Sequence, residues 1–321
     1  MPKFLAPVVA LAMALSVPFA ASAQDKTLKF VLGYPPGASS DILTRLLAEK
    51  MRVSLGVNTV VENRAGAGGI VGTDAVKNAA PDGGTILLTP LAPMVAFPHS
   101  HGAAVRYDPF KDFVPVAHVS DFQLALVVSA ELPAKSVAEY VALVKKEPKL
   151  GDYASAAAGS LPHYLGVMFS KAAGLDMTHV PYKGTAPALQ ALAGGEVKAG
   201  MFVLSDALTL VRSGKARLLA VAGTKRASLT PDVPTFKELG YDLEASAWYA
   251  LFAPAGTPRE IVDRYAKAAI DAVRSPDLKQ RLEQMGLEPT GLGPAELARI
   301  LRADYDKWVP VIKASGFKPM Q

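Results

Sequence analysis

The chain has 321 residues, contains no cysteine and carries a formal net charge of +5. The lack of cysteine excludes disulfide bonds, thiolate catalysis and cysteine-based zinc sites. Lysine and arginine are dispersed among acidic residues rather than gathered in blocks with aromatics, which excludes the usual electrostatic pattern of a nucleic-acid-binding protein. A chain of this length can bury a large core, and its length alone favours two domains.

The first 23 residues have the pattern of a secretory signal peptide. Lys3 supplies the positive start, residues 4–19 form an apolar run, and Ala21-Ser22-Ala23 fits the small-x-small cleavage rule. A transmembrane anchor is the alternative, but the run is shorter than the ~20 residues that a bilayer requires. We therefore predict cleavage after Ala23 and export to the periplasm without a membrane anchor.

Strands and helices alternate after residue 24, which predicts an α/β fold with a mostly parallel sheet. Several strand candidates are continuous apolar runs, as expected for strands that are buried on both faces. The predicted strands are Leu28–Leu32, Thr59–Val61, Thr85–Thr89, Phe122–Ser129, Lys198–Val203, Arg217–Ala222 and Trp248–Ala253.

Two extended segments, Val114–Ser129 and Ala245–Pro254, stand out as candidate crossings between two domains. Two crossing strands would insert a middle domain into a first domain that is built from both chain ends. The predicted first domain is 24–122 plus 248–321, and the predicted second domain is 123–247. Such a pair of domains opens and closes around a cleft by hinge motion.

The most informative motif is a loop of small residues between the first predicted strand and an amphipathic helix. At a helix start, backbone N–H groups lack partners inside the helix and lie at the positive end of its dipole. A loop of this kind binds carboxylates without a cationic side chain. The loop comprises Tyr34, Pro35, Pro36, Gly37, Ala38, Ser39, Ser40 and Asp41, and the same arrangement recurs at Ala158-Gly159-Ser160 and at Gly184-Thr185.

Cofactor and metal motifs are weak. The stretch from Gly66 to Gly72 follows a strand and opens a helix, but its third glycine falls one place too late for a dinucleotide fingerprint. We interpret it as a tight strand-to-helix turn. His99 and His101 have no acidic neighbour and are predicted to be solvated rather than metal ligands. We expect no cofactor and no metal.

Two residues are candidates for catalysis. His163 lies in the first turn of a predicted helix, where it can donate to a bound anion or hydrogen-bond a loop carbonyl, and the sequence leaves both open. Lys183 could form a Schiff base if it were buried, although its place before a helix start favours a charge or packing role. No G-x-S-x-G elbow is present. We expect no catalysis, and keep a periplasmic enzyme using Lys183 or His163 as the alternative.

Taken together, the motifs resemble those of the Bug family, the periplasmic substrate-binding receptors of tripartite tricarboxylate transporters. The resemblance extends over the whole chain after residue 23, and its motifs follow the family's order. They are Pro-Pro-Gly-Ala-Ser-Ser-Asp (35–41), Val-Glu-Asn-Arg-Ala-Gly-Ala-Gly-Gly (61–69), Pro-Asp-Gly-Gly-Thr-Ile-Leu-Leu (81–88), Gly-Ser-Leu-Pro-His (159–163), Val-Pro-Tyr-Lys-Gly-Thr-Ala-Pro-Ala-Leu (180–189) and Ala-Pro-Ala-Gly-Thr-Pro (253–258).

The resemblance implies a two-domain Venus-flytrap fold, similar to type II periplasmic binding proteins, with the ligand in the cleft between the domains. In such proteins, backbone amides, small hydroxyls and ordered waters hold the carboxylate. The chain departs from the family at Ala38, where glycine is usual, and at Tyr34, where phenylalanine is common. Ligand identity therefore does not carry over, since family ligands include di- and tricarboxylates, acidic amino acids and aromatic carboxylates.

The predicted function is that of a periplasmic solute-binding protein. It would capture a small carboxylate, either an organic acid or an acidic amino acid, and deliver it as a monomer to the membrane permease subunits of a tripartite tricarboxylate-type transporter. A partner that presents the ligand to a sensory receptor is a second alternative. The predicted ligand-binding residues are Tyr34, Pro36, Gly37, Ala38, Ser39, Ser40, Asp41, Thr89, Gly159, Ser160, His163, Lys183, Gly184, Thr185 and Asp206.

Overall fold

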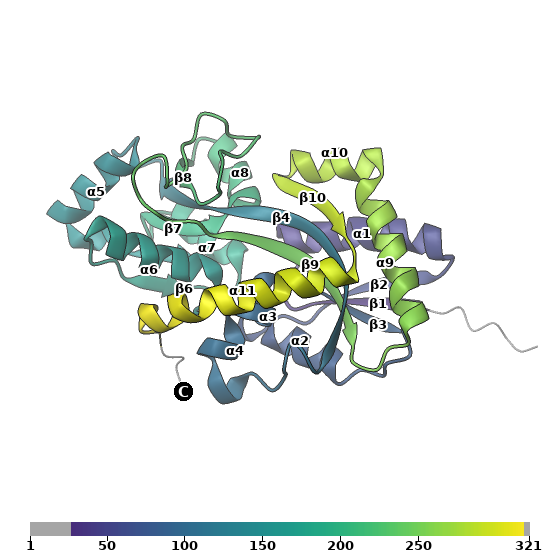
Figure 1. The fold of residues 1–321 in the computed structure, drawn as a ribbon. Coiled ribbons are helices and arrows are strands. Elements are labelled where there is room, and N and C mark those ends of the chain that lie inside the picture. The colour runs from purple at the N-terminus through teal and green to yellow at the C-terminus, as the bar shows by residue number, and fades with distance from the viewer. Residues whose placement is uncertain (1–26, 318–321) are drawn as a thin grey trace, which may run out of the picture.

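Two lobes, joined by long strands, make up the computed structural model, which describes residues 27–317 (Figure 1). The predicted signal peptide, residues 1–23, lies outside the described residues. From residue 27 to residue 317, none of the helices combines the length and the apolar character that a membrane crossing requires.

The first lobe begins with three parallel strands. Its elements are β1 (Thr27–Leu32), α1 (Ser39–Leu55), β2 (Asn58–Asn63), a 3₁₀ turn (Ala67–Gly69), α2 (Ile70–Lys77), β3 (Thr85–Pro90), α3 (Leu91–Val95), α4 (Phe97–Ser100) and a second 3₁₀ turn (Gly102–Ala104). Strand β1 lies between β2 and β3, with Lys29 opposite both Val60 and Thr85. Parallel neighbours need a crossover, and α1 and α2 supply it. The carboxyl ends of β1 and β3 therefore meet at one edge, where the loop after β1 begins.

The second lobe repeats this alternation on a smaller scale. Its elements are α5 (Val137–Lys146), a 3₁₀ turn (Pro148–Gly151), β5 (Tyr153–Ser155), α6 (Leu161–Ala173), β6 (His179–Pro181), α7 (Thr185–Ala193), β7 (Ala199–Val203), α8 (Leu204–Arg212) and β8 (Ala216–Val221). Strand β5 pairs in parallel with β6 and β7. Helices α6, α7 and α8 follow the carboxyl ends of their strands, so their N-termini face the first lobe.

Strand β4 (Phe113–Ser129) belongs to both lobes. Its first part pairs antiparallel with β9 (Ser246–Pro254), from Phe113 to Gln123, and its last part pairs with β7 and β8. The strand order is β2-β1-β3-β9-β4-β7-β5-β6, so a single sheet runs through the molecule. The two predicted crossing strands are confirmed.

The C-terminal elements close the first lobe. They are α9 (Arg259–Arg274), α10 (Pro276–Gln284), β10 (Leu287–Leu292) and α11 (Pro294–Ser315). Strand β10 pairs with β4, while α11 runs along both lobes and contacts α3 in the first and α6 in the second (Figure 1). Trp308 of α11 is buried, and its ring centroid lies 6.3 Å from that of Tyr164 in α6.

The seven predicted strands are all present, six of them within a few residues of the expected bounds, while the strand predicted from Phe122 begins nine residues earlier, at Phe113. Three strands were missed: β5 and β6 are only three residues long, and β10 contains Pro289 and Gly291. The expectation of a mostly parallel sheet was wrong, because four strand pairings are parallel and five are antiparallel. The antiparallel pairings arise because β4 and β9 cross between the lobes in opposite directions.

Candidate ligand-binding site

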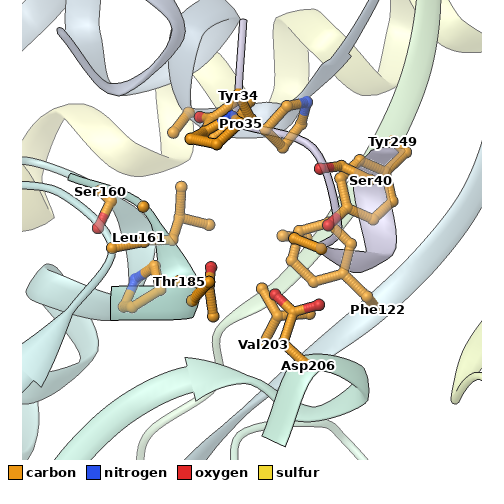
Figure 2. A pocket seen from close by; sticks show the side chains of 18 of the residues that line it. Tyr34, Pro35, Ser40, Phe122, Ser160, Leu161, Thr185, Val203, Asp206 and Tyr249 are labelled. Atoms are coloured by element: carbon orange, nitrogen blue, oxygen red, sulfur yellow. The ribbon is translucent and has the colours of Figure 1, made fainter. Parts of the chain in front are cut away.

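A cavity of about 120 Å³ lies between the two lobes (Figure 2). The N-termini of α1 from the first lobe and of α6 and α7 from the second all line it, through Ser40, Leu161 and Thr185. In the first turn of each helix, backbone N–H groups cannot find an acceptor inside the helix. Three positive dipole ends therefore converge on one space, which is an arrangement that favours an anion.

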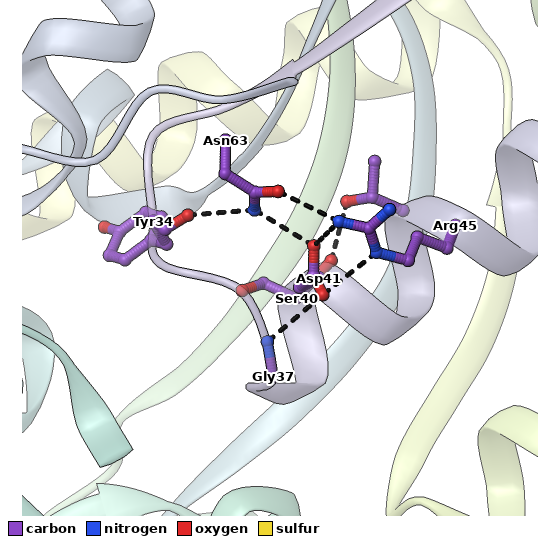
Figure 3. Close-up of polar contacts among 7 residues, drawn as sticks. Tyr34, Gly37, Ser40, Asp41, Arg45 and Asn63 are labelled. Carbon is purple, nitrogen blue, oxygen red and sulfur yellow. Dashed lines mark hydrogen bonds and ion pairs between the residues drawn. The ribbon is translucent and has the colours of Figure 1, made fainter. Parts of the chain in front are cut away.

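The loop before α1 is fixed by Asp41. Its carboxylate accepts hydrogen bonds from Gly37 N (3.1 Å), Asn63 Nδ2 (2.9 Å) and Arg45 Nε (3.1 Å), as Figure 3 shows. Asn63 also donates to the Tyr34 carbonyl oxygen at 3.0 Å. Partial burial raises the pKa of Asp41, but the hydrogen bonds from Arg45, Asn63 and Gly37 outweigh it and hold that pKa below its usual value. Asp41 thus positions the loop, with its carboxylate turned away from the cavity.

Gly159 and Ser160 shape the start of α6. The Ser160 hydroxyl caps the helix by accepting from His163 N at 3.4 Å, and it donates to the Ala157 carbonyl at 2.7 Å. Gly159 has φ +71°, and a Cβ there would lie 2.3 Å from Cε1 of His101. Only glycine allows this close approach in this backbone conformation.

His163 is used inside the loop. Its Nδ1 accepts a hydrogen bond from Gly159 N at 2.9 Å, so the ring bonds an amide of the loop rather than the carbonyl that one of our two expectations named. The ring stacks on His179 with centroids 4.0 Å apart. Burial, with a smaller effect of His101, lowers the pKa of His163 to about 4. The ring is therefore neutral near pH 7, and it holds the loop before α6 in place through its bond to Gly159 N, without lining the cavity.

The start of α7 brings the lobes close together. Gly184 has φ +110°, and a Cβ there would lie 3.2 Å from Cγ of Pro35 in the first lobe. Its N–H donates to the Ala156 carbonyl at 2.9 Å, which fixes the turn before Thr185. Lys183 is exposed at the rim of the cavity.

Asp206, in the first turn of α8, reaches across to the first lobe. Its Oδ1 accepts a hydrogen bond from Ser39 N at 2.9 Å, and the Ser39 hydroxyl lies 3.2 Å from the hydroxyl of Tyr249. Burial raises the pKa of Asp206, while hydrogen bonds from Ser39 and Thr185 partly offset this effect. Figure 2 shows the Asp206 carboxylate pointing into the cavity.

The structure brings nine of the predicted residues to the cavity wall. These are Tyr34, Pro36, Ala38, Ser40, Ser160, Lys183, Gly184, Thr185 and Asp206. The other six lie behind the wall or in the turns that shape it: Gly37, Ser39, Asp41, Thr89, Gly159 and His163. Thr89, for example, is buried, and its hydroxyl donates to the Pro90 carbonyl at 3.1 Å.

Sequence reasoning missed much of the wall. The apolar side chains that complete it include Leu91, Phe122, Leu161, Val203 and Tyr249. Phe122 and Tyr249 lie on the crossing strands, with ring centroids 4.5 Å apart. The pairing of β4 with β9 brings them together, and no local motif announces it. The only signal was their place in the two predicted crossings.

The glycine-rich stretch forms the tight turn that was predicted, since Gly68 and Gly69 have φ +65° and +109° between β2 and α2. The prediction that His99 and His101 are solvated was wrong. Both rings are half-buried against aromatics: His99 lies 4.1 Å from Tyr305, and His101 lies 4.4 Å from Phe97, between ring centroids. Across residues 27–317, no group of three or more histidine or acidic side chains is arranged to hold a metal.

Two α/β lobes, joined by crossing strands around a cavity lined by helix N-termini, define a periplasmic-binding-protein fold. The sequence matches the profile of the tripartite tricarboxylate transporter family receptor over residues 43–317. The protein BugT of Bordetella pertussis is 34% identical over 294 residues, which cover 91% of this chain and 90% of BugT. The chain therefore belongs to the tripartite tricarboxylate transporter receptor family.

Solved structures agree with this assignment. The periplasmic binding protein BugD has a TM-score of 0.86 at 32% identity, covering 92% of this chain and 99% of BugD. Rpa4515 of R. palustris, solved with adipate, has a TM-score of 0.88 at 30% identity, covering 92% and 98%. MatC of Rhodopseudomonas palustris, solved with malate, has a TM-score of 0.83 at 31% identity, covering 89% and 98%. The family consists of periplasmic solute-binding receptors rather than enzymes.

Proposed function

We propose that this chain captures a small carboxylate in the cavity between its lobes and delivers it to the permease subunits of a tripartite tricarboxylate-type transporter. The observation that carries the proposal is the convergence of the N-termini of α1, α6 and α7 on that cavity. The adipate in Rpa4515 and the malate in MatC support a carboxylate as the ligand class.

Backbone amides would hold the carboxylate. The loop from Tyr34 to Asp41 contains no lysine or arginine, and Lys183 lies at the exposed rim. Each hydrogen bond to a charged group contributes about 1.5–3 kcal/mol. A few such bonds therefore account for micromolar affinity, which corresponds to about 8 kcal/mol.

The predicted site residues divide into two roles. Those at the wall would contact the ligand: Tyr34, Pro36, Ala38, Ser40, Ser160, Lys183, Gly184, Thr185 and Asp206. The remaining ones would hold the loops in place: Gly37, Ser39, Asp41, Thr89, Gly159 and His163. The contacts of Asp41 with Gly37, and of His163 with Gly159, support this division.

The two lobes would move as domains with boundaries at 24–122 plus 248–321 and at 123–247. Strand β4 supports the first boundary, because its partners change from β9 at Gln123 to β7 at Leu124. The N–H of Ala245, which donates to the Ala222 carbonyl at 2.8 Å, supports a return crossing just before β9.

A binding role, rather than catalysis, fits the two residues that an enzyme would use. Nδ1 of His163 is occupied by Gly159 N, and Lys183 is solvent-exposed instead of buried as a Schiff-base lysine requires. Export to the periplasm and action as a monomer complete the proposal. The signal-like N-terminus and the family of periplasmic receptors support the export.

Thermal-shift screening of residues 24–321 against organic acids, followed by calorimetry, tests the proposal. A carboxylate present at 100 times its dissociation constant should add about 2.7 kcal/mol of stability. A deletion strain should lose uptake of the same acid and regain it with the wild-type gene. Unchanged melting with every carboxylate, or intact uptake in the deletion strain with altered signalling, would refute the binding or the transport role respectively.

A further inference from the structure

Much of the cavity wall is hydrocarbon. Phe122 and Tyr249 present their rings from the crossing strands, Leu161 enters from the start of α6, and Val203 comes from the end of β7 (Figure 2). Pro35 and Leu91 extend this surface in the first lobe. An apolar wall of this kind matches a ligand body without charge, because a buried charge needs a partner to replace its water.

Few backbone donors remain for a ligand. In α1, the amide of Ser39 is already taken by Asp206. Pro162 in α6 and Pro187 in α7 have no N–H, which removes one donor from the first turn of each helix. In α1, α6 and α7, the first-turn amides left at the wall are those of Ser40, Leu161, Thr185 and Ala186. This set matches the acceptor capacity of one carboxylate, which has about four lone-pair positions.

The cavity also contains a carboxylate of its own. Of the described lining residues, Asp206 and Lys183 are the ones that carry charge. Lys183 is exposed at the rim, whereas the half-buried Asp206 points inward and is held by Ser39 N at 2.9 Å. A second ligand carboxylate would thus lie close to the Asp206 carboxylate, and two ionised carboxylates repel each other strongly in surroundings where water screens poorly.

We propose that this site selects carboxylates with one negative charge and an uncharged apolar body, and that Asp206 disfavours ligands with a second carboxylate. The inference rests on the proposed function and narrows its ligand class. It also assigns Asp206 a role in determining which ligands bind, in addition to its place on the cavity wall.

The test uses acids that differ only at the far end of the molecule. Hexanoate, adipate and 6-aminohexanoate share six carbons and end in a methyl, a carboxylate or an ammonium group. The compounds 4-methylbenzoate, terephthalate and 4-(aminomethyl)benzoate repeat the comparison on a ring. In calorimetry at pH 7.5, the methyl-ended acid of at least one series should bind at least tenfold more tightly than its two relatives.

A charge-neutral variant tests the role of Asp206. Asp206→Asn keeps an oxygen that can accept from Ser39 N but removes the negative charge, so the preference for the methyl end over the carboxylate end should shrink at least fivefold. Glu49→Gln provides the control. It makes the same charge change on the exposed face of α1, where Glu49 pairs with Arg52 at 2.7 Å, and it should leave the preference unchanged.

The outcomes separate this inference from the proposed function. If a dicarboxylate or an amino acid binds as tightly as the methyl-ended acid, or if only other di- or tricarboxylates bind, the inference is wrong while carboxylate capture stands. If the preference for the methyl-ended acid over the dicarboxylate is the same in Asp206→Asn as in wild type, Asp206 does not contribute to ligand selectivity. If no carboxylate of any kind binds, the proposed function itself fails.

Discussion

The backbone N–H of Ser39 in the first lobe donates a 2.9 Å hydrogen bond to the carboxylate of Asp206 in the second. The bond joins the starts of α1 and α8 across the cavity, so a side chain of the protein occupies one of the amides that an anionic ligand would seek. Under the proposed function, the Ser39 N–H that joins the two lobes is therefore also a donor that the ligand could use.

We expect this bond to bias the lobes toward the closed arrangement. A hydrogen bond to a charged group contributes about 1.5–3 kcal/mol, which changes a two-state equilibrium by about 10- to 150-fold. Asp206→Ala should therefore increase the radius of gyration of the ligand-free protein in small-angle scattering. Asp206→Asn, which keeps an acceptor, should increase it less. Equal radii for wild type and Asp206→Ala would show that the bond does not hold the lobes.

Gly37→Ala should weaken carboxylate binding by about tenfold. Gly37 has φ +100°, a conformation that costs an alanine about 1–3 kcal/mol, and its N–H donates to Asp41. A Cβ there meets nothing within 4 Å, so the reason is backbone strain and not blocked approach of the ligand. Calorimetry gives the dissociation constant.

Gly56→Ala is the matched control for this loop. Gly56 ends α1 with φ +63° and is equally open, so alanine there is also strained, although less than at Gly37, and it lies far from the cavity. Both variants should melt earlier than wild type, and only Gly37→Ala should lose affinity. Equal affinities in the two variants would mean that the conformation of the loop before α1 does not control binding.

Lys183→Met should cost at most about fivefold in affinity. Exposed charges contribute about 0.2–1 kcal/mol, because water and salt screen them, and Lys183 is exposed at the rim. The small loss should disappear at high ionic strength, which titration in 0.5 M salt would measure. Complete loss of binding would instead identify Lys183 as the main partner of the carboxylate.

His163→Asn should make the protein less sensitive to acid. The folded-state pKa of His163 is about 4, below the value of about 6.5 in an unfolded chain. The stability from its neutral ring is present above pH 6.5 and is lost as the pH falls toward 4, by about 2.5 kcal/mol at pH 4.5. Asparagine can accept from Gly159 N without titrating, so the variant should not show the loss of stability that protonation of His163 causes in wild type.

Urea denaturation of the His163→Asn variant and of wild type, from pH 8 to pH 4.5, measures this effect. Above pH 7, the two proteins should differ by a constant free energy of unfolding, because the ring is neutral there in both states. As the pH falls further, the free energy of unfolding should decrease more in wild type than in the variant. The His179 ring, stacked on His163 with its own pKa lowered to about 3 by burial and by His163, should titrate in both proteins. Parallel curves over the whole range would contradict the prediction.

The helix starts at the cavity were predictable because their signals are local. Proline, glycine and serine between a strand and an apolar helix face fix where α1, α6 and α7 begin, and the structure has them at Ser39, Leu161 and Thr185. A helix start also fixes which amides lack partners. The chemistry that we propose for this cavity could therefore be inferred before its geometry was known.

The contacts that hold the loop before α1, and the apolar residues of the cavity wall, could not be inferred in this way. Asn63 holds Tyr34 and Asp41 from the end of β2, and Phe122 meets Tyr249 only because β4 pairs with β9. These contacts depend on which strands become neighbours. The same dependence explains the wrong expectation of a mostly parallel sheet, since the direction of a strand relative to its neighbours is not encoded in its own residues.

Strand β4 has a consequence for how the molecule unfolds. Its 17 residues supply pairing partners to β9 and β10 in one lobe and to β7 and β8 in the other. Neither lobe retains its share of the sheet without this strand, so melting one lobe removes a strand from the other. Calorimetry should accordingly show one cooperative transition, and either lobe expressed alone should fail to fold.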